Sequence, residues 1–176
     1  IKPRPCVFEY IYFARPDSII ENKCAYEYRK NLGIQLAKET DFEADLVVPV
    51  PDSGVPAALG FAEYSKKNFE LGLIRNHYVG RTFIEPTQNI RSLGVKLKLS
   101  STKTIVKNKS VILIDDSLVR GTTCHKIVKM LYEAGAKEVH VRIACPEIKF
   151  PDFYGVDMPT KKELLAHEKS LDEMCN

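Results

Sequence analysis

Two adjacent acids close an apolar run in the second half of the chain, where residues 111–123 read VILIDDSLVRGTT. Successive side chains of a strand point to opposite faces, but at the end of a strand both Asp115 and Asp116 can reach one crevice. Carboxylates there can accept hydrogen bonds from sugar hydroxyls and can hold a hard cation, directly or through water. The arrangement therefore predicts a site for a sugar diol and a divalent cation.

The loop after the two acids has the composition of an anion site. Gly121 permits a tight turn with close backbone approach, and Thr122 and Thr123 open a predicted helix. The free N–H groups of residues 117–123, the helix dipole and the two hydroxyls favour a bound phosphate. The alternative is a plain helix cap behind two solvated acids. An isolated Asp-Asp pair would favour that alternative, whereas the complete string favours a ligand site.

A second loop, PVPDSG at residues 49–54, follows another predicted strand. A compact loop at this point can present backbone N–H groups to an anion. The alternative is an ordinary connection in which Asp52 or Ser53 caps the next helix, and the segment alone favours that alternative.

A basic stretch follows, because residues 75–109 contain eight Lys or Arg and one acid, a net charge of +7. This stretch is either a solvated loop or part of a loop that closes over an anionic ligand, which the charge would attract. Its first part, residues 75–91, is rich in polar and turn residues and is the predicted closing loop.

Strands alternating with helices must position these loops. Hydrophobic patterning predicts strands at residues 7–13, 45–50, 71–74, 110–114 and 138–144, and helices at 25–38, 55–65 and 122–134. The predicted inward faces are Tyr28, Leu32 and Leu36 on the first helix and Ile127, Val128, Leu131 and Ala134 on the last, which Gly135 ends. This order predicts an α/β fold with a parallel, doubly wound sheet, in which ligands bind outside the carboxyl ends of the strands.

Composition narrows the class of protein. The 176 residues, 44% of them hydrophobic, fit one domain, and a net charge of +3 does not argue for nucleic acid binding. No apolar run approaches the roughly 18 residues of a membrane-spanning helix, and no signal peptide is visible. The five cysteines form no CxxC pair, which disfavours a zinc ribbon or a disulfide framework and indicates reduced thiols in a cytoplasmic protein.

The string at residues 111–123 resembles the signature of type I phosphoribosyltransferases, which use 5-phosphoribosyl-1-pyrophosphate (PRPP). The resemblance implies their fold, a central parallel sheet flanked by helices with a small hood formed by the two ends of the domain. It implies Mg²⁺ as cofactor, with contacts from Ser53, Asp115 and Asp116. The family's pyrophosphate loop, which often carries a non-proline cis peptide, corresponds to residues 49–54. The PRPP-binding residues implied are Asp52, Ser53, Gly54, Asp115, Asp116, Ser117, Val119, Arg120, Gly121, Thr122 and Thr123.

Four further segments resemble the glutamine PRPP amidotransferases: EYIYFARPDS at 9–18, RNHYVGRTFI at 75–84, PDFYGVDMPT at 151–160 and ELLAH at 163–167. That family makes 5-phosphoribosylamine and pyrophosphate from PRPP and glutamine-derived ammonia, the committed step of purine synthesis. The resemblance implies catalytic roles for Arg75, Tyr78 and Arg81, with Tyr12 and Tyr78 near the ammonia channel. It also implies purine nucleotide effectors and a homo-oligomer, with no nucleic acid or membrane partner.

The chain departs from that family in three respects. Residues 1–176 correspond to the synthase domain alone, so we expect a fragment that lacks the family's preceding glutaminase domain and its carboxyl end. Cys6 stands at the first ligand position of the [4Fe–4S] cluster of one branch, but Asp152 stands at the second, so no cluster is predicted. Arg75 and His77 replace the usual lysine and arginine. Two alternatives stay open, a type I transferase for a nucleobase and a PRPP-binding regulator without catalysis.

Overall fold

The computed structural model describes residues 4–39, 42–76, 98–152 and 160–175. Its main sheet has four strands in the order β4-β3-β7-β8, and each neighbouring pair is parallel. The strands span Leu46–Pro49 (β3), Asn68–Phe69 (β4), Ser110–Asp115 (β7) and Glu138–Ile143 (β8). The predicted parallel α/β sheet is therefore confirmed, although the short edge strand β4 was not expected.

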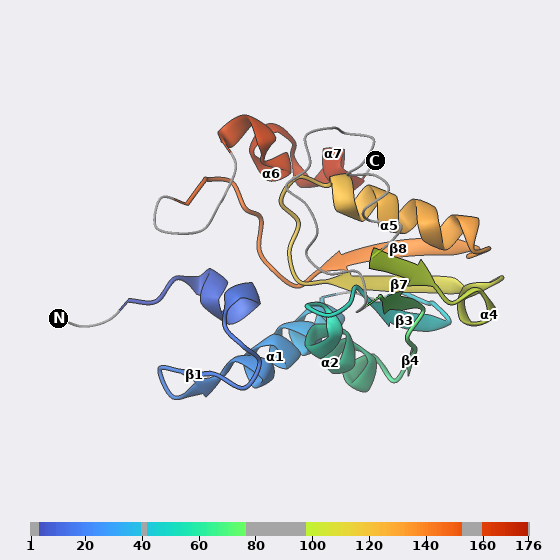
Figure 1. Cartoon of the computed structure of the whole chain (residues 1–176), viewed down its shortest axis with the longest axis horizontal. Helices are drawn as coiled ribbons and strands as arrows, with labels where there is room; N and C mark the ends of the chain where they lie inside the picture. The colour runs from blue at the N-terminus through green and yellow to red at the C-terminus, as the bar shows by residue number, and fades with distance from the viewer. Residues whose placement is uncertain (1–3, 40–41, 77–97, 153–159, 176) are drawn as a thin grey trace.

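The helices cover both faces of this sheet, with α5 (Thr122–Glu133) on one side and α1 (Ala25–Lys38) and α2 (Val55–Ser65) on the other, as Figure 1 shows. Alternate residues of β7 pack on the two faces of the sheet. Val111 and Leu113 pack in the core that includes the α5 residues Ile127 and Leu131, whereas Ile112 and Ile114 pack in the core that includes Ala57 and Phe61 of α2. A strand buried on both faces reads as a continuous apolar run, which is why its position was visible in the sequence.

The boundaries of α1 and α2 match the predicted ones, and α5 ends at Glu133, one residue earlier than expected. Gly135 follows with φ +97°, a left-handed conformation that suits glycine after a helix end. The predicted inward face of α5 is confirmed by the burial of Ile127, Leu131 and Ala134, with Val128 half-buried.

The predicted inward face of α1 was shifted by one residue. The buried stripe consists of Ala25, Arg29, Gly33 and Ala37, whereas Tyr28, Leu32 and Leu36 are half-buried beside it. Small residues allow α1 and α2 to approach closely. A Cβ atom at Gly33 would lie 1.8 Å from the carbonyl oxygen of Ala57, and one at Gly60 would lie 2.0 Å from that of Lys30.

We expect Gly33→Ala to lower the free energy of unfolding by about 1–3 kcal/mol, because the methyl group must push the two helix backbones apart. Urea denaturation followed by circular dichroism measures the change. Asn31→Ala is the matched control, since it adds no volume and Asn31 is exposed on the same helix. If the two variants were equally stable, the helices would not be in contact at Gly33.

The predicted strand at residues 7–13 is wrong, because Glu9–Phe13 forms a short π-helix, η1. Aromatic and β-branched residues favour strands in general, but here a helical turn buries Tyr10 and Ile11 and brings three other rings together. The ring centroids of Phe8 and Tyr12 are 6.0 Å apart, and those of Phe8 and Phe13 are 5.4 Å apart. Tertiary packing therefore overrides strand propensity in this segment.

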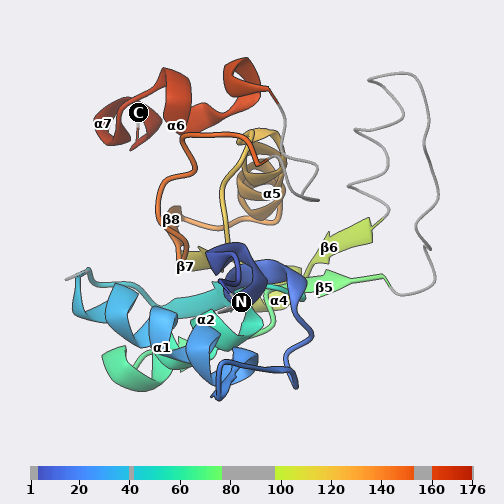
Figure 2. The ribbon, with the colours of Figure 1, turned by 90° about the vertical axis from the view of Figure 1, so that its left-hand side faces the viewer.

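Two small antiparallel pairs lie outside the main sheet. The first pairs β1 (Ile19–Ile20) with β2 (Lys23–Cys24). The second pairs β5 (Leu73–Arg75) with β6 (Leu99–Ser101), and Figure 2 shows these two strands side by side. The strand predicted at 71–74 is thus present at 73–75, but it does not join the parallel sheet. Residues 77–97, between β5 and β6, fall outside the described residues and include Tyr78, Arg81 and most of the predicted closing loop.

The remaining short elements are α4 (Lys103–Val106) and, after the sheet, η2 (Lys161–Glu163), α6 (Leu165–Glu168) and α7 (Leu171–Cys175). In Figure 1, α6 and α7 lie on the α5 side of the sheet, while η1 lies on the α1 side. Two elements near the ends of the described chain, η1 and α6, therefore lie on opposite sides of the carboxyl end of the sheet. None of the helices in the described ranges has the length and apolar composition needed to cross a bilayer.

Candidate functional site

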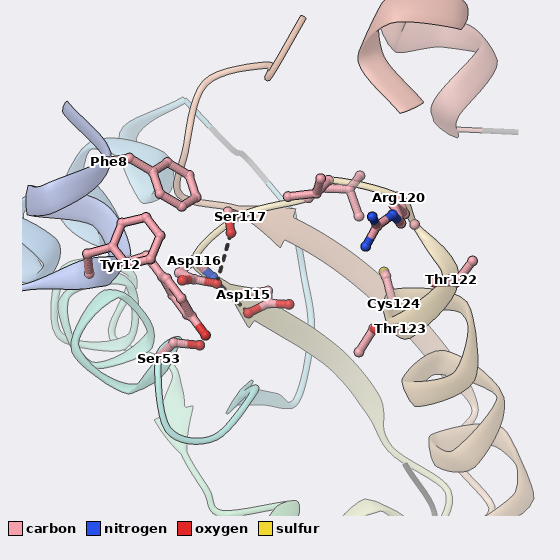
Figure 3. A pocket seen from close by; sticks show the side chains of 14 residues that line it. Phe8, Tyr12, Ser53, Asp115, Asp116, Ser117, Arg120, Thr122, Thr123 and Cys124 are labelled. Atoms are coloured by element: carbon pink, nitrogen blue, oxygen red, sulfur yellow. Dashed lines mark hydrogen bonds between the residues drawn. The ribbon is translucent and has the colours of Figure 1, made fainter. Parts of the chain in front are cut away.

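A cavity of about 500 Å³ opens at the carboxyl end of β7. Nine of the eleven residues predicted to bind PRPP line it: Ser53, Asp115, Asp116, Ser117, Val119, Arg120, Gly121, Thr122 and Thr123. Figure 3 shows the two aspartates between the aromatic residues Phe8 and Tyr12 on one side and the start of α5 on the other. The structure thus brings the predicted site for a sugar diol and the predicted site for an anion together around one cavity.

Asp115, the last residue of β7, and Asp116, which follows it, place their carboxyl groups on different sides of this space. Asp115 continues the register of Val111 and Leu113, which face α5, and its charge acts on the Cys124 thiol of that helix, whose pKa is raised by burial and then by Asp115. Asp116 lies on the α1 side, where burial lowers the pKa of Arg29 and the charge of Asp116 opposes that shift. The pair therefore spans the floor of the cavity.

The carboxyl pair is electrostatically strained. Asp115 Oδ1 accepts a hydrogen bond of 2.9 Å from the Asp116 amide, and Asp116 Oδ1 accepts one of 3.3 Å from the Ser117 hydroxyl. Asp116 Oδ2 is buried and has no partner within the described residues. Burial, and next the neighbouring Asp116 charge, raise the pKa of Asp115 from 3.8 to about 8, and burial raises that of Asp116. Such a pair favours an added cation, because a cation stabilises both ionised forms.

The anion loop runs from Ser117 to the start of α5. Gly121 is the residue before the helix and has φ +75°, which a residue with a Cβ rarely adopts. Within the described part of the chain, the backbone N–H groups of residues 118–124 donate to no protein carbonyl. The beginning of a twelve-residue helix and a row of free amides form a site suited to a phosphate.

Segments near the carboxyl end of the chain pack over this loop. The Leu165 amide donates a 2.9 Å hydrogen bond to the Val119 carbonyl, and the Arg120 Nε donates one of 2.8 Å to Glu163 Oε2. A Cβ atom at Gly121 would lie 3.1 Å from a Leu165 methyl carbon. Residues 163–165 therefore hold the anion loop from outside, and they occupy the Arg120 side chain in an ion pair.

The loop at residues 49–54 is packed against the end of β7. The Val50 amide donates to the Ile114 carbonyl at 2.8 Å, and the Gly54 amide donates to the Val50 carbonyl at 2.9 Å. A Cβ atom at Gly54 would lie 2.5 Å from the Ile114 carbonyl oxygen, so glycine permits this close approach. The peptide bond between Pro51 and Asp52 is cis. Ser53 faces the cavity, while the Gly54 amide is already hydrogen-bonded and is not free to bind an anion.

Arg75 connects this loop to the predicted closing segment. Its Nη1 lies 2.6 Å from Asp52 Oδ2, and both side chains are about half exposed. Neither residue lines the 500 Å³ cavity. The other two predicted catalytic residues, Tyr78 and Arg81, lie outside the described residues.

The donor set fits Mg²⁺ bound together with a phosphorylated ligand. Asp115, Asp116 and Ser53 supply hard oxygen atoms, and the orphaned Asp116 Oδ2 is available as a ligand. In the described ranges no group of three His, Cys, Asp or Glu side chains forms a self-sufficient metal site. Mg²⁺ typically uses one or two carboxylates and completes its octahedron with water and phosphate oxygens.

The sequence analysis missed three residues that line the cavity, Phe8, Phe13 and Cys124, and it assigned Tyr12 only through family resemblance. The spacing of Phe8 and Tyr12, four residues apart, was the available signal for a helical turn with one aromatic face. A further long-range contact joins Cys6 and Asp152, whose Sγ and Oδ2 atoms are 3.9 Å apart. The two positions at which the family resemblance implies cluster ligands are therefore neighbours in space.

Residues 25–149 match the phosphoribosyl transferase domain family. Over 95% of its length the chain is 60% identical to the amidophosphoribosyltransferase of Rhizobium etli, and over 96% it is 57% identical to that of Methanocaldococcus jannaschii. It spans 34% and 36% of those two proteins. The structure resembles that of the glutamine PRPP amidotransferase from B. subtilis, complexed with ADP and GMP, with a TM-score of 0.86, 53% identity, and coverage of 96% of this chain and 37% of the other.

Proposed function

This chain belongs to the phosphoribosyl transferase domain family and has the type I phosphoribosyltransferase fold, and on that premise we propose that it is a pentosyltransferase of the amidophosphoribosyltransferase kind. The reaction proposed is the conversion of PRPP and ammonia to 5-phosphoribosylamine and pyrophosphate. The observation that supports it most is one cavity with a carboxylate pair on its floor and a row of free amides at its rim.

The site residues are assigned roles that follow from their chemistry. The amides of residues 117–123 and the hydroxyls of Thr122 and Thr123 bind the 5-phosphate at the start of α5. Asp115 and Asp116 accept hydrogen bonds from the ribose hydroxyls, and the alternation of β7 lets each carboxylate approach the sugar from a different side. Ser53 and the amides of Asp52 and Ser53 face the pyrophosphate.

Displacement at the anomeric carbon passes through an oxocarbenium-like state, so positive charge grows on the ribose and negative charge on the departing pyrophosphate. Asp115 and Asp116 stabilise the first, and the 52–53 amides stabilise the second. Bound Mg²⁺ would neutralise pyrophosphate oxygens and hold PRPP against Asp115, Asp116 and Ser53. Arg75, Tyr78 and Arg81 are proposed to cover the leaving group and to exclude water, which otherwise competes with ammonia.

The activity of the whole protein is a further part of the proposal, because the chain spans about a third of the length of its curated relatives. We propose that residues 1–176 are the synthase domain of a longer cytoplasmic homo-oligomer in which glutamine supplies the ammonia. The name of the B. subtilis relative includes glutamine, and its structure contains ADP and GMP. Purine nucleotides are therefore the proposed effectors. No iron–sulfur cluster is proposed, because Asp152 replaces a thiolate.

An acceptor assay tests this function. The complete protein is incubated with PRPP, Mg²⁺ and one acceptor at a time, namely ammonia, hypoxanthine, orotate or uracil, and pyrophosphate release is measured. We expect release with ammonia and no release above the rate in buffer with the three nucleobases. Release with a nucleobase would indicate a different transferase of the same fold. Saturable PRPP binding without pyrophosphate release would indicate a regulator.

A further inference from the structure

Arg29 is a buried arginine with no carboxylate partner at ion-pair distance in the described part of the chain. Only 6% of the residue is exposed, and it lies in the stripe of α1 that packs against α2. A buried charge is unfavourable unless hydrogen bonds and nearby charges compensate for it. An apolar residue of similar length would fill the same space, so the guanidinium group calls for a separate explanation.

The guanidinium group holds the end of η1. Its Nε donates a 2.7 Å hydrogen bond to the Tyr10 carbonyl, and its Nη2 donates one of 2.8 Å to the Ala14 carbonyl and a longer one of 3.5 Å to that of Glu9. Carbonyl groups at the end of a helix lack partners within the helix. The rigid fork of one arginine side chain satisfies several of them at once and thereby fixes η1 on α1.

The segment fixed in this way forms the aromatic wall of the cavity, which consists of Phe8, Tyr12 and Phe13. Tyr12 is 51% exposed and Phe13 is 44% exposed, so burial alone holds these two rings weakly. Their ring centroids are 5.4 Å apart, and Phe8 packs against both. The position of the wall therefore depends on how the backbone of η1 is held.

The other side of Arg29 faces the carboxylate floor of the cavity, which consists of Asp115 and Asp116. Arg29, Ser53 and Asp116 surround one packing gap that is too small for a water molecule, together with apolar residues that include Ile11 of η1 and Leu32 of α1. Asp116 is the acidic residue whose charge acts on the guanidinium group, and its Oδ2 atom is the buried oxygen without a partner. One side chain thus lies between the aromatic wall and the carboxylate floor and interacts with both.

We propose that Arg29 is a positioning residue that fixes the aromatic wall of the cavity relative to its carboxylate floor. This inference rests on the proposed function, because its consequence concerns the fate of PRPP in the site. A displaced wall leaves phosphate binding at the 117–123 loop intact but admits water beside the anomeric carbon. Turnover with ammonia then falls, and a larger share of PRPP is hydrolysed to ribose 5-phosphate and pyrophosphate.

Two variants of the complete protein test this inference. Arg29→Met keeps the length of the side chain without charge, and Arg29→Lys keeps the charge but cannot bridge the Tyr10 and Ala14 carbonyls. For both we expect kcat with ammonia to fall roughly 10- to 100-fold, the range expected when a reacting group is displaced by about 1 Å. The KM for PRPP should change by less than about threefold, and the hydrolysed fraction of PRPP should rise. Arg15→Lys, at an exposed arginine paired with Asp17, is the matched control and should leave all three quantities unchanged.

The outcomes separate this inference from the function on which it rests. If the unchanged protein releases no pyrophosphate from PRPP and ammonia, the proposed function fails. If the unchanged protein does release pyrophosphate, but either folded Arg29 variant retains its kcat and its hydrolysed fraction of PRPP, the positioning role is wrong. Full rescue by lysine alone would also overturn it, because charge without the fork would then suffice. Thermal denaturation identifies which variants fold, and if the methionine variant does not, the lysine variant decides the question.

Discussion

Replacing Asp115 and Asp116 together by asparagine is expected to abolish Mg²⁺-dependent PRPP binding. Asparagine keeps the shape of each side chain but removes the negative charge that binds a hard cation and strengthens hydrogen bonds from ribose hydroxyls. A hydrogen bond to a charged group contributes about 1.5–3 kcal/mol, and 1.4 kcal/mol corresponds to a factor of ten. The dissociation constant should therefore rise at least roughly 100-fold, which titration calorimetry with and without Mg²⁺ can measure.

Asp45→Asn is the matched control for this experiment. Asp45 precedes β3 at the amino end of the sheet, and its carboxylate accepts a 2.8 Å hydrogen bond from the Ser110 amide. The substitution removes the same charge far from the cavity, so PRPP affinity should stay within about twofold. Unchanged affinity in a folded double variant would show that the carboxylate pair does not bind the ligand. A loss of affinity in the control as well would point to a change in overall charge or folding instead.

The main sheet, the helices around it and the centre of the site could be predicted because their signals are local. Residues 110–134 contain a strand, two acids, a loop and a helix in one continuous stretch, and the structure has these elements in that order. Burial on both faces requires β7 to be apolar throughout, so its end and the change to acids are visible without knowledge of distant contacts.

The parts that could not be predicted depend on residues far apart in the sequence. The π-helix at residues 9–13 exists where Arg29 of α1 satisfies its terminal carbonyls, and no local pattern reveals that interaction. The packing of residues 163–165 on the anion loop joins segments more than forty positions apart. Similarly, the small residues that bring α1 and α2 together have little hydrophobic signal, so they do not mark the buried face of α1 until the partner helix is known.

The carboxylate pair also has a consequence for stability, because a site prepared for a cation is unfavourable in the absence of that cation. Asp115 accepts a hydrogen bond from the Asp116 amide but has no basic partner in the described ranges, and its pKa is raised from 3.8 to about 8 by burial and by Asp116. Between these two values the folded protein retains a proton that the unfolded chain releases. Stability therefore falls as the pH rises through this range. Functional sites commonly show this exchange of stability for activity.

We therefore expect Asp115→Asn to stabilise the ligand-free protein, with a gain that grows from near zero below pH 4 to its full size above pH 8. The gain at pH 8 should be at least about 1.4 kcal/mol, the free energy of a single pKa unit. Urea denaturation at a series of pH values measures it. Asp45→Asn is again the control, and here its effect has the opposite sign. The Ser110 amide lowers the pKa of Asp45, so this variant should lose stability above about pH 4 and lose none in strong acid. A gain for Asp115→Asn that did not depend on pH would mean that Asp115 is not a source of electrostatic strain. A loss of stability at pH 8 would mean that its charge is already compensated in the folded protein.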